Sequence, residues 1–185
     1  MKRFFASMAI AVAGFASTAS AALPELIIGA GTAVAPLTPY CQDFDRTLSA
    51  DTIYVLTGLY YVEPGFSLTI EPGTVIKGDD SSAGTLVITR GAQIFAQGTP
   101  SMPIVFTSQY APGARASGDW GGIIILGDAP VNKVNPLIEG GLIAGSCGGG
   151  GGTYGGSDPS DNSGVLSYVR IEFPGYRFAL NNEVN

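Results

Sequence analysis

A repeated apolar triplet is the feature of this sequence that most constrains its fold. The triplet starts at Leu68, again at Leu86 and again at Ile104, so each copy begins 18 residues after the previous one. Two glycines, Gly73 and Gly91, keep the same spacing. A short repeat of β-forming residues separated by turns is typical of a solenoid, in which like strands stack on like. The sequence therefore predicts an all-β fold, a single-stranded parallel β-helix with about 18 residues per coil.

The same repeat predicts how the coils turn and stack. Two similar segments, 63–66 and 71–74, both begin Glu-Pro-Gly, which is the pattern of a type II turn. Because side chains alternate along a strand, we expect Ile70, Ile88 and Phe106 to form one internal column. Right-handed crossovers are the strong default for parallel strands, so we expect a right-handed coil.

Composition agrees with an all-β, exported chain. The 27 glycines argue against a helical domain, because glycine costs about 1 kcal/mol per helix position relative to alanine. Without Lys2 and Arg3, which precede the predicted cleavage point, seven basic side chains face 15 acidic ones, a net charge of about −8. This charge argues against nucleic acid as a partner.

The N-terminus has the pattern of a secretory signal peptide. Two basic residues precede an apolar run over 4–15, which closes on small residues ending at Ala21. The run is too short for a stop-transfer helix, so no membrane span is expected after its removal. We expect a signal peptide over 1–21 and a mature chain that is secreted or held at the outer cell surface.

The mature chain divides into a short entry segment and one repeat domain. Residues 22–51 show no sustained period and are interpreted as a leader or N-terminal cap, and residues 52–185 as the β-helix. Residues 144–162 are glycine-rich and are expected to form a flexible loop excursion. The pattern stops at Asn185 where another coil is expected, which indicates the N-terminal part of a longer protein.

Cys41 and Cys147 are the only cysteines. In an oxidising compartment they would either form one disulfide or remain two unpaired thiols, and the sequence leaves both open. A zinc site is not expected, because the chain has no histidine and two cysteines do not complete a four-ligand shell.

Several motifs resemble those of a known family. They include Ile70 to Gly78, Pro103 to Ser108, Trp120 to Gly122 and Asp161 to Leu166, and together they cover most of residues 52–185. This pattern resembles secreted bacterial right-handed parallel β-helix repeat proteins. The resemblance implies an extracellular or surface β-helix and carries no catalytic residues with it.

One acidic loop has the composition of a calcium site. Asp158, Asp161 and Asn162 offer oxygen ligands within a few residues of one another, which suits calcium. The alternative is an Asx-rich turn whose side chains bond their own backbone. No other cofactor is indicated.

Catalysis and ligand stacking are the remaining hypotheses. Asp79 with Asp80, or Asp119, would be the acid and base of a polysaccharide lyase or hydrolase on a β-helix, although adjacent carboxylates are common in solvated turns. Trp120 and Tyr154 are candidates to stack on a sugar or to anchor a protein partner, with core packing as the alternative for Trp120.

The function that these patterns favour is a non-enzymatic β-helix scaffold with a structural, adhesive or glycan- or protein-binding role. The lyase or hydrolase is the first alternative. A left-handed β-helix acyltransferase is the second, because isoleucines at 70, 76, 88 and 94 fall on a six-residue grid.

Overall fold

The structure is a computed structural model that describes residues 21–29, 39–134, 136–138, 142, 147–148, 151–179 and 182–183. The predicted signal peptide, apart from Ala21, lies outside these residues. Every helix or strand element among the described residues is a β-strand, so the predicted all-β class is confirmed. None of the described segments forms an apolar helix long enough to cross a membrane.

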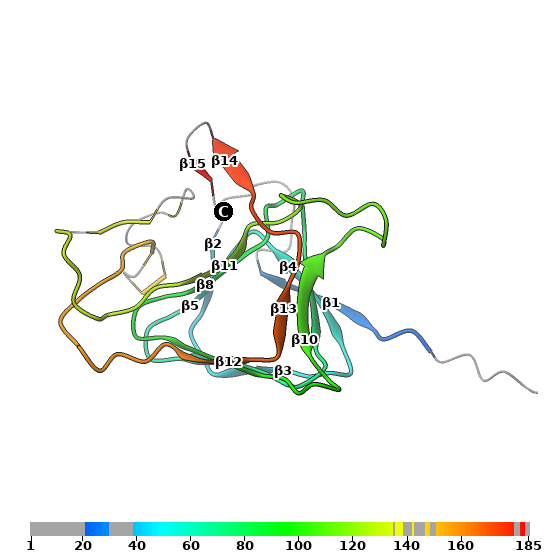
Figure 1. Ribbon diagram of the computed structural model, residues 1–185, viewed down its shortest axis with the longest axis horizontal. Coiled ribbons are helices and arrows are strands. Elements are labelled where there is room, and N and C mark those ends of the chain that lie inside the picture. Colours follow the sequence, from blue (N-terminus) through cyan, green and yellow to red (C-terminus); the bar gives the residue numbers. More distant parts are fainter. Residues whose placement is uncertain are drawn as a thin grey trace, which may run out of the picture.

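The strands form three parallel sheets that surround a common interior (Figure 1). Sheet A contains β1 (Glu25–Gly29), β4 (Ile53–Thr57), β7 (Val75–Gly78), β10 (Ile104–Ser108) and β13 (Val169–Ile171). Sheet B contains β2 (Pro39–Gln42), β5 (Leu59–Val62), β8 (Thr85–Ile88) and β11 (Gly122–Ile125). Sheet C contains β3 (Arg46–Leu48), β6 (Ser67–Ile70), β9 (Gln93–Gln97) and β12 (Gly164–Ser167). A short antiparallel pair, β14 (Arg177–Ala179) and β15 (Asn182–Glu183), follows.

The chain visits the sheets in the order A, B, C and then returns to A, so three successive strands make one coil. This arrangement is a parallel β-helix, as predicted. Residues 22–51, interpreted from the sequence as a leader or cap, contribute the first strand of every sheet, and β1 pairs with β4 over five residues.

The predicted coil length and internal column are wrong. Paired residues on adjacent coils are 22 positions apart between β4 and β7, 26 between β6 and β9, and 30 between β7 and β10. Ile70, Ile88 and Phe106 lie on β6, β8 and β10, which belong to three different sheets. The step of 18 residues therefore advances two strands, not a full coil. The steps of 22 and 26 residues are also not multiples of six. The coils therefore lack the regular six-residue period on which the acyltransferase alternative is based.

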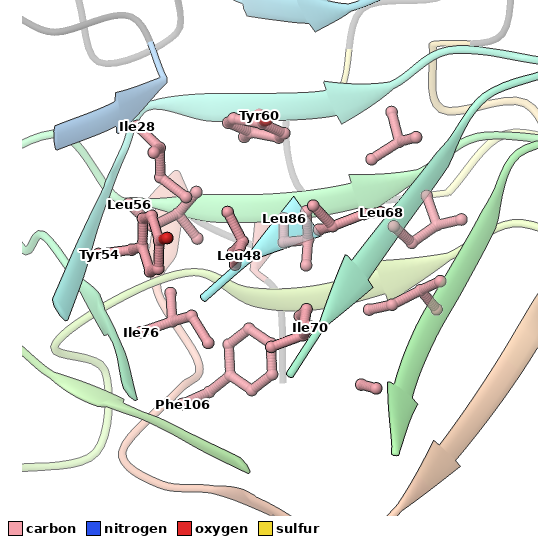
Figure 2. Packing of buried hydrophobic residues seen from close by; sticks show 14 of the residues in the cluster. Ile28, Leu48, Tyr54, Leu56, Tyr60, Leu68, Ile70, Ile76, Leu86 and Phe106 are labelled. Atoms are coloured by element: carbon pink, nitrogen blue, oxygen red, sulfur yellow. The ribbon is translucent and has the colours of Figure 1, made fainter. Parts of the chain in front are cut away.

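The interior is filled by the alternate residues of each strand. In β6 and β7 exposure alternates between partly exposed and buried side chains, as expected for a strand with one face inward. Tyr54, Ile76 and Phe106 form one true column, because their strands pair in this register. Figure 2 shows these three side chains within the apolar cluster. Each fully buried aliphatic side chain stabilises the fold by about 1.5–3 kcal/mol relative to exposure.

The predicted type II turns are confirmed as corners. Gly65 and Gly73 both have positive φ, 87° and 88°, at the third position of their turns. Phe66 N donates to Glu63 O at 3.1 Å, and Thr74 N donates to Glu71 O at 3.2 Å. Gly65 N also donates to Gly91 O at 2.9 Å, so Gly91 stacks on Gly65. The 18-residue spacing relates Gly91 to Gly73, but the corner glycine that stacks on Gly91 in the neighbouring coil is Gly65.

Trp120 closes the interior between sheets A and B. Its side chain is fully buried and lies parallel to the ring of Phe106, with ring centroids 6.3 Å apart. The indole Nε1 donates to the carbonyl oxygen of Glu172 at 2.8 Å. Gly78 lies against it, and a Cβ at that position would stand 2.4 Å from the Trp120 Cβ. Trp120 therefore fixes the packing of the coil that contains β10 and β11.

Candidate functional site

The outer face of sheet B is covered. All residues of β5 and β8 are buried, although a strand with one face in solvent would show alternating exposure. The cause is a second apolar cluster outside the coil, made of residues from sheet B and from the connection after β11: Leu59, Tyr61, Val87, Ile124, Leu126, Leu142 and Cys147. The interior of the β-helix and this outer cluster thus share sheet B as a common wall.

Residues 126–156 belong to the connection between β11 and β12 and are named the cover segment. They contribute the part of this cluster that does not come from sheet B. Figure 1 shows its described parts outside β5, β8 and β11. Ile138 and Tyr154 from this segment pack on the outer cluster. Leu142, Cys147 and Tyr154 of this segment therefore pack against sheet B, whereas Val134 is exposed, and the flexibility predicted for 144–162 stays a prediction.

A disulfide joins the cover segment to the first coil. Cys41 on β2 and Cys147 are bonded, with their Cα atoms 5.2 Å apart and 106 positions apart in sequence. Among the described residues, these two sulfurs and a carboxylate oxygen of Glu63 form the one group of metal-ligand atoms that converge, all within 4.8 Å of one another. The disulfide fixes the cover segment at the N-terminal side of sheet B.

Two adjoining hollows lie beside the cover segment, one at the end of β11 and one near Arg90, which follows β8. The larger, about 540 Å³, is lined by Ile125, Leu126, Gly127, Lys133, Leu137, Ile138 and Tyr154. The smaller, about 290 Å³, is lined by Arg90, Val131, Lys133, Pro136, Thr153, Tyr154, Gly155 and Gly156. Tyr154 and Lys133 line both hollows. Together the hollows form a groove with an apolar part and a polar part, named the cover groove below.

Two basic side chains, Arg90 and Lys133, line the cover groove. Arg90 Nη1 donates to the carbonyl oxygen of Gly155 at 2.6 Å and lies 3.6 Å from Asp128 Oδ1. Arg90 Nε is buried and has no hydrogen-bond partner among the described residues. Lys133 is exposed, and it takes part in no ion pair between described residues. Arg90 is paired with Asp128, so Lys133 is the basic side chain of the groove that is available to a negative or polar group of a ligand.

The groove wall is held by close backbone contacts. Gly155 N donates to Gly127 O at 2.7 Å, and Gly156 N donates to Ala129 O at 3.1 Å. A Cβ at position 156 would lie 1.9 Å from Asp128 Oδ1, so glycine is needed for this approach. The wall is therefore preformed by backbone geometry and not by side chains alone.

The structure separates the two aromatic ligand candidates. Tyr154 lines the cover groove and remains partly exposed. Trp120 is fully buried in the interior. A ligand in solvent has no access to its indole, so core packing is the role that its surroundings allow.

The acidic loop predicted as a calcium site forms Asx turns. Asp158 Oδ1 accepts from Ser160 N at 2.9 Å, and Asn162 Oδ1 accepts from Gly164 N at 2.9 Å. Asp161 Oδ2 reaches back to accept from Asp128 N at 2.9 Å. The bonds of Asp158 and Asn162 are the local backbone contacts of the alternative interpretation, whereas the bond of Asp161 reaches Asp128 at the start of the cover segment. Calcium binding by this loop stays a prediction.

The candidate catalytic acids lie in turns as well. Asp79 Oδ2 accepts from Ser82 N at 2.9 Å, and Asp119 Oδ2 accepts from Ala116 N at 2.9 Å. Asp80 Oδ2 accepts the phenolic hydrogen of Tyr110 at 2.8 Å, and this bond raises the pKa of Tyr110. None of these three acids lines the cover groove.

Arg90 and Lys133 were not singled out by sequence reasoning. Arg90 follows an apolar strand at a corner, and Lys133 lies in a stretch with no period. Only the return of the cover segment over sheet B brings them near Tyr154. No local pattern contains that information, because Arg90 and Lys133 lie 64 and 21 positions before Tyr154 in the sequence.

A family model described as a pectate-lyase like β-helix domain matches residues 40–185. The match covers more than half of the chain, and the chain belongs to this family. It confirms the family resemblance seen in the sequence. Comparison with curated proteins gives no match. Comparison with solved structures gives no match either.

Proposed function

We propose that this protein is an exported β-helix scaffold that binds a glycan in the cover groove. The observation that carries the proposal is the position of Tyr154, which lines both hollows beside Lys133. Aromatic rings pack on the apolar faces of sugars, and nearby cations bind their polar or acidic groups. The N-terminal signal pattern supports export, where extracellular glycans would be available.

The hydrogen bonds of the carboxylates favour binding over hydrolysis. A glycosidase needs an acid and a second carboxylate on either side of the bond to be cut. Asp128 lies beside Gly156, which lines the polar hollow, and it is paired with Arg90. The groove thus offers a stacking surface and cations, and this arrangement supports retention of a ligand.

The alternative function is cleavage of an acidic polysaccharide, which the family description favours. The same experiment distinguishes the two. A glycan that binds and is recovered intact supports the scaffold, whereas the appearance of unsaturated or reducing ends establishes an enzyme.

The test is a binding measurement with matched tyrosine variants. The exported protein is titrated with a panel of neutral and acidic oligosaccharides, and the best ligand is then measured against Tyr154→Ala and Tyr168→Ala. Tyr168 is 59% exposed and lies between β12 and β13, away from the groove linings, so it is the control.

We expect Tyr154→Ala to weaken binding about tenfold, because loss of a stacked aromatic contact of about 1.4 kcal/mol has that effect. Tyr168→Ala should leave the affinity unchanged. Equal affinities for all three proteins would show that the cover groove is not the binding site.

A further inference from the structure

Three potential metal ligands meet at the disulfide that holds the cover segment. Cys41 lies on β2, Glu63 directly follows β5, and Cys147 belongs to the cover segment. Cys41 pairs in register with Tyr61, and Glu63 is two residues further along. Since alternate residues of a strand point to the same side, all three side chains reach the outer face of sheet B.

The backbone holds this meeting point in place. Glu63 N donates to Gln42 O at 3.0 Å, which fixes Glu63 beside β2. Gly148 lies directly against the same turn, since a Cβ there would stand 2.9 Å from Pro64 Cδ and 3.4 Å from Glu63 Oε2. The carboxylate of Glu63 therefore stays beside the sulfurs.

The Glu63 carboxylate lies beside the disulfide. It is half-buried, and no hydrogen bond or ion pair connects it to another described side chain. A disulfide offers it no proton and no positive charge. Its oxygen nevertheless lies within 4.8 Å of both sulfurs.

We propose that Cys41, Cys147 and Glu63 bind Zn²⁺ when the disulfide is reduced. Two thiolates and one carboxylate are three of the ligands that Zn²⁺ takes in tetrahedral sites, and water completes the fourth position. Bond lengths of about 2.0–2.3 Å place such ligand atoms roughly 3.5 Å apart, so the sulfurs separate and the carboxylate moves slightly inward.

Metal binding at this point follows reduction of the disulfide, in two steps. A dithiol reductant gives two electrons and two protons to the disulfide, which becomes two thiols while the reductant becomes a disulfide. Zn²⁺ then displaces the two thiol protons, which leave to solvent, and no further electrons move. The metal would keep the cover segment attached to sheet B under conditions in which the disulfide is lost. This inference is independent of the glycan proposal.

The test uses the reduced full chain and Co²⁺ as a spectroscopic probe. A phosphine reductant opens the disulfide without supplying a competing thiol. We expect a thiolate-to-cobalt charge-transfer band, together with the intense visible absorption of tetrahedral Co²⁺. Zn²⁺ should displace the cobalt, because it binds such sites more tightly.

Two glutamates in equivalent turns supply the matched control. Glu63 and Glu71 both begin a Glu-Pro-Gly turn, but only Glu63 lies beside the sulfurs. Glu63→Gln should weaken Co²⁺ and Zn²⁺ binding at least tenfold, whereas Glu71→Gln should bind as the unchanged protein does. Glu63→Asp, which keeps a carboxylate, should bind more tightly than Glu63→Gln.

Two results would overturn the proposal. One is the absence of a thiolate-to-cobalt band in the reduced chain. The other is equal affinity of Glu63→Gln, Glu63→Asp and the unchanged protein, which would mean that two thiols alone hold the metal, as in an unfolded chain.

Discussion

Removal of the disulfide should weaken the fold strongly, because the bond closes a very long loop. In the variant Cys41→Ala/Cys147→Ala, the unfolded chain regains the freedom that a cross-link over 106 positions removes. Loop-closure entropy gives about 4.7 kcal/mol for a loop of roughly 100 residues. Apolar contacts of the cover segment persist without the bond, so we expect a loss of about 2–5 kcal/mol.

The assay is urea unfolding followed by the fluorescence of Trp120, the single tryptophan. With a slope of about 2 kcal/mol per molar urea, the midpoint should fall by roughly 1–2.5 M. The oxidised, unchanged protein in the same buffer is the control.

The outcome that would refute the reasoning is a midpoint within about 0.3 M urea of the control, a change of less than about 1 kcal/mol. In that case the cover segment would not be bound to sheet B by this bond in solution, and the cover groove would lose its fixed wall.

Three further predictions test the packing, the buried polar network and export. Gly78→Ala should destabilise the protein by about 1–3 kcal/mol in the same urea assay, because the new methyl group overlaps Trp120; unchanged stability would contradict this packing. Burial raises the pKa of Tyr60, whose hydroxyl donates to Gln42 Oε1 at 2.8 Å. The neutral phenol is therefore favoured in the folded state, and the stability that the Tyr60 hydroxyl contributes at neutral pH is lost as pH rises through the raised pKa. Tyr60→Phe should therefore be less stable than the unchanged protein at neutral pH, with a gap that narrows in alkali; a gap independent of pH would speak against it. N-terminal sequencing of the exported protein should begin at Ala22, and an intact Met1 would exclude a cleaved signal peptide.

Sequence reasoning identified the strands well but not their register. The apolar triplets at 68–70, 86–88 and 104–106 all lie in strands, because β-branched and apolar runs between turn residues form strands wherever one face is buried. Their order in space depends on how many residues each corner inserts, and these numbers differ from coil to coil. Since the residues that face inward are similar on all three sheets, the repeat did not reveal which sheet each triplet joins.

The candidate site was predicted only in part. Tyr154 and the cysteines were recognised as residues with chemical potential, and the structure brings Tyr154 into the cover groove. Glycine content predicts flexibility because composition reports backbone freedom and not the contacts that restrict it. The described part of the segment packs on sheet B through side chains such as Leu142, which are scattered between the glycines.

The most direct test of the central claim is hydrogen–deuterium exchange of the protein with and without its best glycan ligand. The claim is that the ligand lies in the cover groove. We predict slower exchange upon binding at 125–127 and 153–156, which line the groove, and no change over 75–78 and 104–108 in sheet A. Slower exchange along β7 and β10, with none at the groove, would place the ligand on the outer face of sheet A and contradict the account.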